Sequence, residues 1–208
     1  MILIGQYDSP FVRRVGIALT LYELPFEHRP WSTFGDVEKI RPYNPLVRVP
    51  TLVLGDGEVL IESHCILDYL DSLVPADRAM FPAAEPARHR ALKVAALATG
   101  LADKAVSLFY EKRLHKEASD LWAERCRAQI LGAAAALEAD RAGRTGGYWF
   151  GGRIGHADVA AAVALRFVAE AHPGLVPMAD FPALGAHAAR LEALPAFQKI
   201  RQPFVPPA

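Results

Sequence analysis

The sequence predicts an α/β domain plus an all-α domain, and three observations carry that prediction. Strand-like and helix-like patterns alternate over residues 1–75. The stretch from Pro75 to Pro86 then holds three prolines and no apolar periodicity. Beyond it, alanine- and leucine-rich helical patterns replace the strands. We therefore expect one domain at 1–75, a linker at 76–86 and an all-helical domain at 87–208.

Composition and charge argue against several classes of partner. Hydrophobic residues make up 52% of the 208 residues and charged residues 22%, the balance of a globular protein with a sizeable core. Lysine plus arginine and aspartate plus glutamate both number 23, so no net basic field favours nucleic acid or an anionic membrane. The chain starts without a basic leader and its uncharged runs are too short to span a bilayer, so we expect a cytoplasmic protein.

The cysteines and histidines favour neither a disulfide framework nor a metal site. Cys65 and Cys126 lie in helical patterns, which fits reduced and buried thiols. No His-x-x-x-His or Cys-x-x-Cys spacing occurs, so we expect no metal.

The first predicted corner joins a strand to a helix near Ser9. A short apolar run opens the chain and predicts a buried strand. Ser9 and Pro10 are typical of the N-cap and first position of a helix, and apolar residues recur up to about Leu24 with Arg13 and Arg14 on the other face. Free backbone N–H groups and the positive helix end favour an anion here, although a plain cap explains Ser9 as well.

The other elements of the first domain complete a mixed four-stranded sheet with helices packed on it. A hairpin turns at Gly55-Asp56-Gly57, and Ser63 is expected to cap the helix after it. The expected elements are a short strand near 26–29, a short helix at 36–41, hairpin strands at 51–54 and 59–61, and a helix at 64–73.

The second domain is expected to be a bundle of helices. Ser119 caps one helix, and the nearly all-apolar pattern of another predicts a central position. The expected helices are 87–117 as one helix or a pair, then 119–142, 156–170, and two short helices between 181 and 201 that are separated at Pro195.

Four motifs together resemble a glutathione S-transferase of the bacterial, serine-type kind. They are Ser9-Pro10-Phe11-Val12, Val49-Pro50, Glu62-Ser63, and Ala157-Asp158-Val159 with Phe181-Pro182-Ala183-Leu184. The resemblance implies a thioredoxin-like first domain, an all-helical second domain and usually a homodimer. At Gly155 the family usually has serine or threonine, so the capping box with Asp158 is at best half made.

The resemblance also implies how glutathione would bind. Val49, before a cis Pro50, would offer its backbone N–H and C=O to the cysteinyl residue as an added strand. Ser63 would receive the γ-glutamyl carboxylate while Glu62 faces the ammonium group. Arg48 is a candidate for the glycyl carboxylate. The plain alternatives are a trans proline that starts a strand, a simple helix cap, and a surface arginine that binds nothing.

The resemblance implies catalysis by Ser9. No cysteine stands at position 9 or 12, so the corner has no thiolate of its own, and the Ser9 hydroxyl would donate to the thiolate of glutathione. A small hydrophobic electrophile would then lie against a set of mostly aromatic residues, although aromatics at helical spacing also suit a plain core. The set is Tyr7, Phe11, Phe109, Tyr110 and Arg113.

The predicted function is therefore a glutathione transferase that activates its co-substrate as a thiolate, with a role in detoxification. Two alternatives stay open at this point. One is a glutathione- or ligand-binding protein that keeps the fold without the chemistry. The other is a glutathione-dependent peroxidase or isomerase, which uses the same thiolate.

Overall fold

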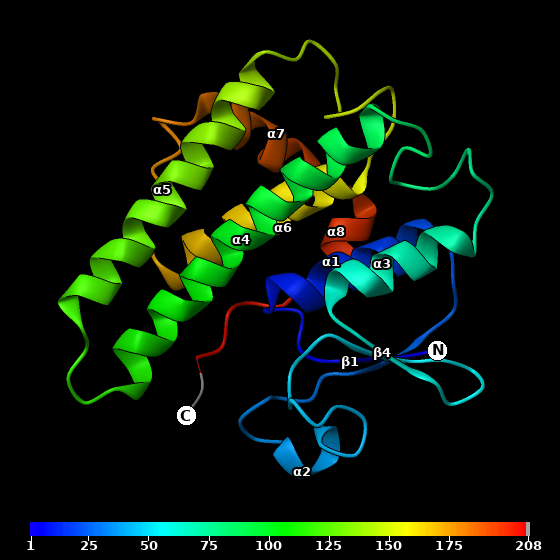
Figure 1. The fold of residues 1–208 in the computed structure, drawn as a ribbon, viewed down its shortest axis with the longest axis horizontal. Helices are drawn as coiled ribbons and strands as arrows, with labels where there is room; N and C mark the ends of the chain where they lie inside the picture. The colour runs from blue at the N-terminus through cyan, green and yellow to red at the C-terminus, as the bar shows by residue number, and fades with distance from the viewer. Residues whose placement is uncertain (207–208) are drawn as a thin grey trace. The chain divides into compact units, whose positions relative to one another are not determined.

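In the computed structural model, which describes residues 1–206, the chain forms two compact units (Figure 1). The first unit comprises Met1–Met80 and the residues from Leu194 onward, and the helical unit comprises Phe81–Ala193. No helix within the described residues is long and apolar enough to cross a membrane. Cys65 is exposed, contrary to the expectation of a buried thiol, while Cys126 is buried.

The first unit is built on a four-stranded mixed sheet, as predicted. Its strand order is β2-β1-β3-β4; β1 and β2 are parallel, and the other two neighbouring pairs are antiparallel. In the register, Ile2 lies between Glu27 and Val53, and Thr51 opposes Ile61. The strands are β1 (Ile2–Ile4), β2 (Glu27–Arg29), β3 (Thr51–Val53) and β4 (Val59–Ile61).

Helices cover both faces of this sheet. Figure 1 shows α1 (Pro10–Leu21) and α3 (Ser63–Ser72) on one face and α2 (Val37–Ile40) on the other. Leu3 and Ile4 are consecutive and both fully buried, which requires cover on both sides because successive side chains of a strand point to opposite faces. On the α2 face, Ile40 packs with Ile4.

Residues 194–206 belong to the first unit, whereas the sequence assigned all of 87–208 to the helical domain. Arg13 explains this placement. Its Nε donates to the carbonyl oxygen of Ile200 at 2.8 Å, and its Nη2 donates to that of Phe197 at 3.1 Å, at the end of α8 (Pro195–Lys199). A cation at a helix C-terminus satisfies orphan carbonyls. Arg13 and Arg14 were predicted on the face of α1 opposite its apolar residues, and both are nevertheless buried.

The first part of the expected linker is tied to the first unit through Tyr22. The phenol oxygen of Tyr22 accepts from the backbone N–H of Met80 at 2.7 Å and donates to Asp71. Arg78 Nη2 donates to the backbone carbonyl of Tyr22 at 3.4 Å. These contacts explain why the first unit extends to Met80.

The helical unit is formed by four long or medium helices. The predicted 87–117 segment is a single helix, and Ser119 caps the next one by accepting from the backbone N–H of Trp122 at 3.3 Å. Twelve of the 16 residues of α6 are buried, as its apolar pattern predicted. The helices are α4 (Ala87–Leu114), α5 (Asp120–Ala142), α6 (His156–Ala171) and α7 (Pro182–Glu192).

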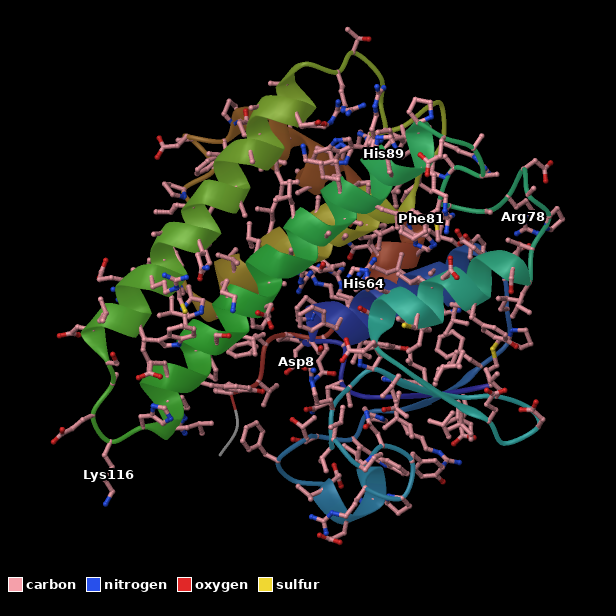
Figure 2. The ribbon with its side chains drawn as sticks, viewed as in Figure 1. Asp8, His64, Arg78, Phe81, His89 and Lys116 are labelled. Carbon is pink, nitrogen blue, oxygen red and sulfur yellow. The ribbon has the colours of Figure 1, made fainter. Side chains whose placement is uncertain are left out.

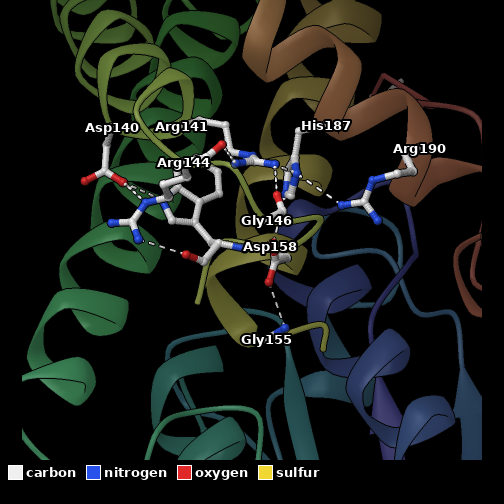
Figure 3. A network of polar contacts seen from close by, with 9 residues as sticks. Asp140, Arg141, Arg144, Gly146, Gly155, Asp158, His187 and Arg190 are labelled. Atoms are coloured by element: carbon white, nitrogen blue, oxygen red, sulfur yellow. Dashed lines mark hydrogen bonds and ion pairs between the residues drawn. The ribbon is translucent and has the colours of Figure 1, made fainter. Parts of the chain in front are cut away.

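A buried carboxylate fixes the start of α6 (Figure 3). Asp158 Oδ2 accepts from the backbone N–H of Gly155 at 2.8 Å, and Oδ1 accepts from that of Trp149 at 2.8 Å. His187 Nε2 lies 2.9 Å from Oδ1. Gly155 has no side chain to complete the reciprocal half, so the capping box is half made, as expected. Asp158 is therefore structural.

Candidate active site

The Ser9 corner combines a helix cap with an available donor. Ser9 is the N-cap of α1, and its Oγ accepts from the backbone N–H of Val12 at 3.4 Å. Within residues 1–206 its hydroxyl proton has no acceptor. The side chain is partly exposed. Ser9 therefore caps the helix and still has an O–H to donate to an incoming anion.

The C-terminal segment runs along this corner, which the sequence did not indicate. The side-chain oxygen of Gln202 accepts from the backbone N–H of Tyr7 at 3.2 Å, and the backbone N–H of Val205 donates to Asp8 at 3.1 Å. Figure 2 labels Asp8 at this place. The segment thus satisfies backbone and side-chain groups next to Ser9 and leaves the Ser9 hydroxyl to other partners.

The Val49-Pro50 loop closes onto the same corner. The Val49–Pro50 peptide is cis, and the backbone N–H and C=O of Val49 have no partner among the described residues. Gly5 makes the approach possible: it has φ +127°, and a Cβ there would lie 2.5 Å from Val12 and 2.8 Å from Val49. An unpaired backbone edge of this kind suits pairing with an extended peptide.

The start of α3 brings Glu62 and Ser63 together. Glu62 is the N-cap, with φ +65° and ψ 120°, a backbone conformation that costs a non-glycine residue about 1–3 kcal/mol. Ser63 is the first helical residue and is buried. Contrary to expectation, it is therefore not the N-cap of the helix. Arg48 Nη1 lies 3.1 Å from Glu62 Oε1, with both side chains about half exposed, so this pair contributes little stability.

Arg14 contacts the candidate site residue Ser63, a contact that the sequence interpretation missed. It lies on α1, and its Nη1 donates to Ser63 Oγ at 3.4 Å. The pKa of His64, which is labelled in Figure 2, is lowered to about 4, mainly by burial and also by the charge of Arg14. His64 is therefore neutral at pH 7. A signal existed, because Arg14 precedes Ile17 and Ala18 by three and four residues and so shares their apolar stripe.

Tyr7 and Phe11, expected to contact the second substrate, belong to the first unit. The Tyr7 ring stacks on His28, with centroids 3.8 Å apart, and burial raises the pKa of its phenol to about 12. It therefore stays protonated at neutral pH and packs inside the unit. Phe11 is half-buried in the first turn of α1, two positions after Ser9.

Phe109, Tyr110 and Arg113 lie on α4 of the helical unit. Phe109 and Arg113 line a pocket of about 570 Å³, whereas Tyr110 does not. The reason is helical geometry: Leu108 and Phe109 recur four residues later as Lys112 and Arg113 and form one face of α4, and Tyr110 lies outside that face. Lys112 and Arg127 also line this pocket, so with Arg113 three cations stand beside its apolar wall.

The opposite wall of the pocket is formed by the end of α6 and the residues after it. His172 Nε2 donates to the carbonyl oxygen of Ala105 at 2.8 Å, and burial lowers the pKa of His172. Its imidazole is neutral at pH 7, and its ring meets that of Phe109 edge-on, with centroids 6.4 Å apart. The pocket therefore offers an aromatic, largely uncharged floor with cations at its side. Among the described residues no group of three or more potential metal ligands occurs.

Comparison with known proteins identifies the family. Residues 3–78 match the glutathione S-transferase N-terminal domain, and residues 120–190 match the glutathione S-transferase C-terminal domain. The uncharacterized GST-like protein YibF of Escherichia coli (strain K12) is 35% identical over 103 residues, which is 50% of each chain. The probable glutathione S-transferase GSTU1 of Oryza sativa subsp. japonica is 31% identical over 169 residues, 77% of this chain and 70% of the relative.

Solved structures agree over almost the whole chain. A glutathione S-transferase from Methylobacterium radiotolerans JCM 2831, in complex with glutathione sulfonate, has a TM-score of 0.90 and 28% identity, covering 100% of this chain and 98% of that one. A glutathione transferase family member from Pseudomonas fluorescens Pf-5 with bound glutathione has a TM-score of 0.83 and 28% identity, covering 98% and 99%. The predicted thioredoxin-like and helical fold is confirmed. The chain belongs to the glutathione S-transferase family.

Proposed function

We propose that this protein is a glutathione transferase in which Ser9 holds the thiol of glutathione as a thiolate. The observation that carries the proposal is the Ser9 hydroxyl, whose oxygen accepts from Val12 while its proton has no acceptor within the described chain. A charge-assisted hydrogen bond and the positive end of α1 both favour an ionised sulfur. Together they would stabilise the thiolate by about 2–3 kcal/mol and lower the thiol pKa from about 8.5 by about two units.

Two further groups of the first unit support glutathione as the co-substrate. The unpaired backbone edge of Val49 before Pro50 suits the cysteinyl residue as an added strand. Ser63 at the start of α3 suits the γ-glutamyl carboxylate, and Glu62 suits the ammonium group beside it. Arg48, paired with Glu62 and half exposed, is the weaker candidate for the glycyl carboxylate. Solved relatives of the same fold bind glutathione or glutathione sulfonate.

The reaction is nucleophilic attack by the thiolate on an electrophilic carbon. The sulfur forms the new C–S bond, the leaving group departs with the bonding electron pair, and the thiol proton passes to solvent when glutathione ionises. The pocket of Phe109, with Arg113 and Lys112 beside it, supports a role in holding a flat apolar electrophile that also carries a negative charge. Tyr7 and Phe11 of the first unit remain candidates for contact with the electrophile.

The Ser9→Ala variant tests the proposal. We expect the pKa of bound glutathione, followed by thiolate absorbance, to rise by about one unit or more, and turnover near neutral pH to fall with glutathione affinity little changed. The lost cap should also cost about 0.5–2 kcal/mol of stability. Ser119→Ala is the matched control, because it deletes an equivalent cap on α5. An unchanged thiol pKa with full activity in Ser9→Ala would contradict the role of Ser9.

The electrophile is tested with a matched pair of halogenated dinitroaromatics, one neutral and one carrying a carboxylate. Lys112→Ala should raise the KM for the carboxylate form by about two- to fivefold and leave the neutral form unchanged, as expected for an exposed cation. Equal effects on both would show that the pocket does not select charge. The homodimer, the cytoplasmic location and the role in detoxification stay predictions.

A further inference from the structure

Arg14 is a buried cation whose guanidinium is mostly unpaired. The residue is 0% exposed, and among the described residues its Nε and Nη2 have no hydrogen-bond partner. Its hydrogen bond to Ser63 Oγ is long, at 3.4 Å, and no described carboxylate forms an ion pair with it. Burial lowers the pKa of Arg14 to about 9, which leaves it charged at neutral pH. A buried charge without partners is unfavourable, so this arrangement requires an explanation.

The neighbouring arginine shows that burial on α1 does not by itself leave a guanidinium unpaired. Arg13 is 2% exposed, yet its Nε and Nη2 donate to two carbonyl oxygens at the end of α8. Of these two consecutive arginines, Arg13 therefore has backbone acceptors, whereas Arg14 has only its long hydrogen bond to Ser63. Arg13 has a structural explanation in the contacts of the protein itself, and Arg14 does not.

The surroundings of Arg14 are positive as well. Its partner Ser63 is 2% exposed and opens α3, a ten-residue helix whose N-cap Glu62 makes no side-chain cap hydrogen bond. The first N–H groups of such a helix are orphan donors and carry partial positive charge. A buried guanidinium and an uncapped helix start thus face the same hydroxyl. An anion at this hydroxyl would compensate both.

We propose that Arg14 is a positioning residue for the carboxylate that Ser63 binds. Its Nη1–H occupies a lone pair of Ser63 Oγ, so the hydroxyl proton is turned toward the ligand, and its charge is compensated when the ligand's carboxylate arrives. The inference rests on the proposed function, because it takes Ser63 as the site of the γ-glutamyl carboxylate. Arg14 itself stays buried and acts through Ser63.

This role predicts that Arg14 strengthens the binding only of ligands that carry the γ-glutamyl carboxylate. The carboxylate gains from the oriented hydroxyl and from the buried charge, whereas the rest of glutathione does not. A tripeptide analogue in which the γ-glutamyl residue is replaced by γ-aminobutyrate lacks only that carboxylate. Arg14 should therefore increase the affinity for glutathione and have almost no effect on the affinity for the analogue.

The test measures the Kd of both ligands by calorimetry in the wild-type protein and in Arg14→Met. We expect Arg14→Met to weaken glutathione binding by about tenfold or more and to change analogue binding by less than about twofold. Equal weakening of both ligands, or no weakening of either, would overturn the proposal. Arg14→Lys keeps the charge and a donor, and should recover most of the lost discrimination.

Arg13→Met is the matched control for removing a buried arginine from α1. It should lower the melting temperature of the unliganded protein and leave the ratio of the two dissociation constants unchanged. Arg14→Met should keep or raise that melting temperature, because an apolar side chain replaces an unpaired charge. A melting temperature of Arg14→Met that falls as far as that of Arg13→Met would assign Arg14 a structural role.

A double-mutant cycle separates this inference from the proposed function. If Ser63→Ala weakens glutathione binding and Arg14→Met does not, the carboxylate site stands and the inference fails. If Ser63→Ala has no effect, the carboxylate site itself is wrong. We expect Arg14→Met to cost much less affinity in the Ser63→Ala background than in the wild type, because its route to the ligand is gone.

Discussion

The starts of α3 and α6 solve the same electrostatic problem in opposite ways. Each helix begins without a serine or threonine side chain bonded to its first N–H groups, and each helix start attracts negative charge. At α6 the chain supplies the charge itself, because Asp158 accepts from two backbone N–H groups. At α3 the chain supplies no such carboxylate, and places the buried cation Arg14 behind Ser63.

We interpret this difference as that between a structural helix start at α6 and a proposed binding start at α3. A carboxylate from within the chain closes the start of α6, and the surrounding network of Figure 3 fixes its position. The start of α3 is left with donors and positive charge, and our proposal is that the carboxylate there comes from a ligand. Under this proposal the electrostatics that stabilise the start of α6 bind a ligand at the start of α3, and the variants below test the two roles separately.

The largest expected effect is the loss of Asp158. Asp158→Ala leaves the buried backbone N–H of Trp149 and the partly buried N–H of Gly155 without an acceptor and removes the buried partner of His187, so we expect the free energy of unfolding to fall by about 3–5 kcal/mol. Chemical denaturation measures the loss, and the folded fraction should keep its glutathione affinity. Asp140→Ala is the control, because this carboxylate of the same network is 40% exposed and should cost about 1 kcal/mol. Equal losses would contradict the role of Asp158.

Removing the polar side chains at α3 should do the reverse. Glu62→Ala with Ser63→Ala should raise the Kd for glutathione by about tenfold or more and change the free energy of unfolding by less than about 1 kcal/mol, because neither side chain caps the helix. Calorimetry and denaturation give the two quantities. A large loss of stability with unchanged affinity would mean that the start of α3 is structural like that of α6.

A single variant sharpens the comparison at Glu62. Glu62→Gly deletes the carboxylate and also relieves the positive φ of +65°, so we expect it to bind glutathione more weakly while its unliganded form melts at a higher temperature. Glu62→Ala keeps the strained backbone and serves as the control. If Glu62→Gly melts no higher than Glu62→Ala, the backbone at this position is not strained.

Local sequence signals predicted most of the fold. The N-cap and proline before α1, the glycine turn of the hairpin and the capping serine of α5 each act over a few residues, so their effect is visible without the fold. The attachment of α8 to the first unit was not visible, because it depends on Arg13 reaching two carbonyls nearly 190 residues further along the chain.

The candidate site was predictable where its chemistry lies in one motif. Ser9, Val49-Pro50 and Glu62-Ser63 could be proposed from the sequence because each motif is contiguous. In the structure Ser9 is partly exposed and the Val49–Pro50 peptide is cis, as expected. Arg14 was missed because arginine is rarely buried. The sequence interpretation therefore placed it on the polar face of the helix, although it lies on the apolar stripe. Tyr110 was expected to line the pocket with Phe109, but it lies outside the face of α4 that forms the pocket wall.

The smallest expected effect completes the comparison at α6. Gly155→Ser restores the missing half of the capping box, and the φ of −128° at this position is an extended backbone that any residue adopts. Because glycine is itself a tolerable N-cap, we expect a gain of only a few tenths of a kcal/mol, about 0.3, in the free energy of unfolding. Differential denaturation against the wild type measures it, with glutathione affinity unchanged. A gain above about 1 kcal/mol in the free energy of unfolding would show that Asp158 alone leaves the first N–H groups of α6 without enough acceptors. The start of α6 would then resemble the start of α3 more than its hydrogen bonds indicate.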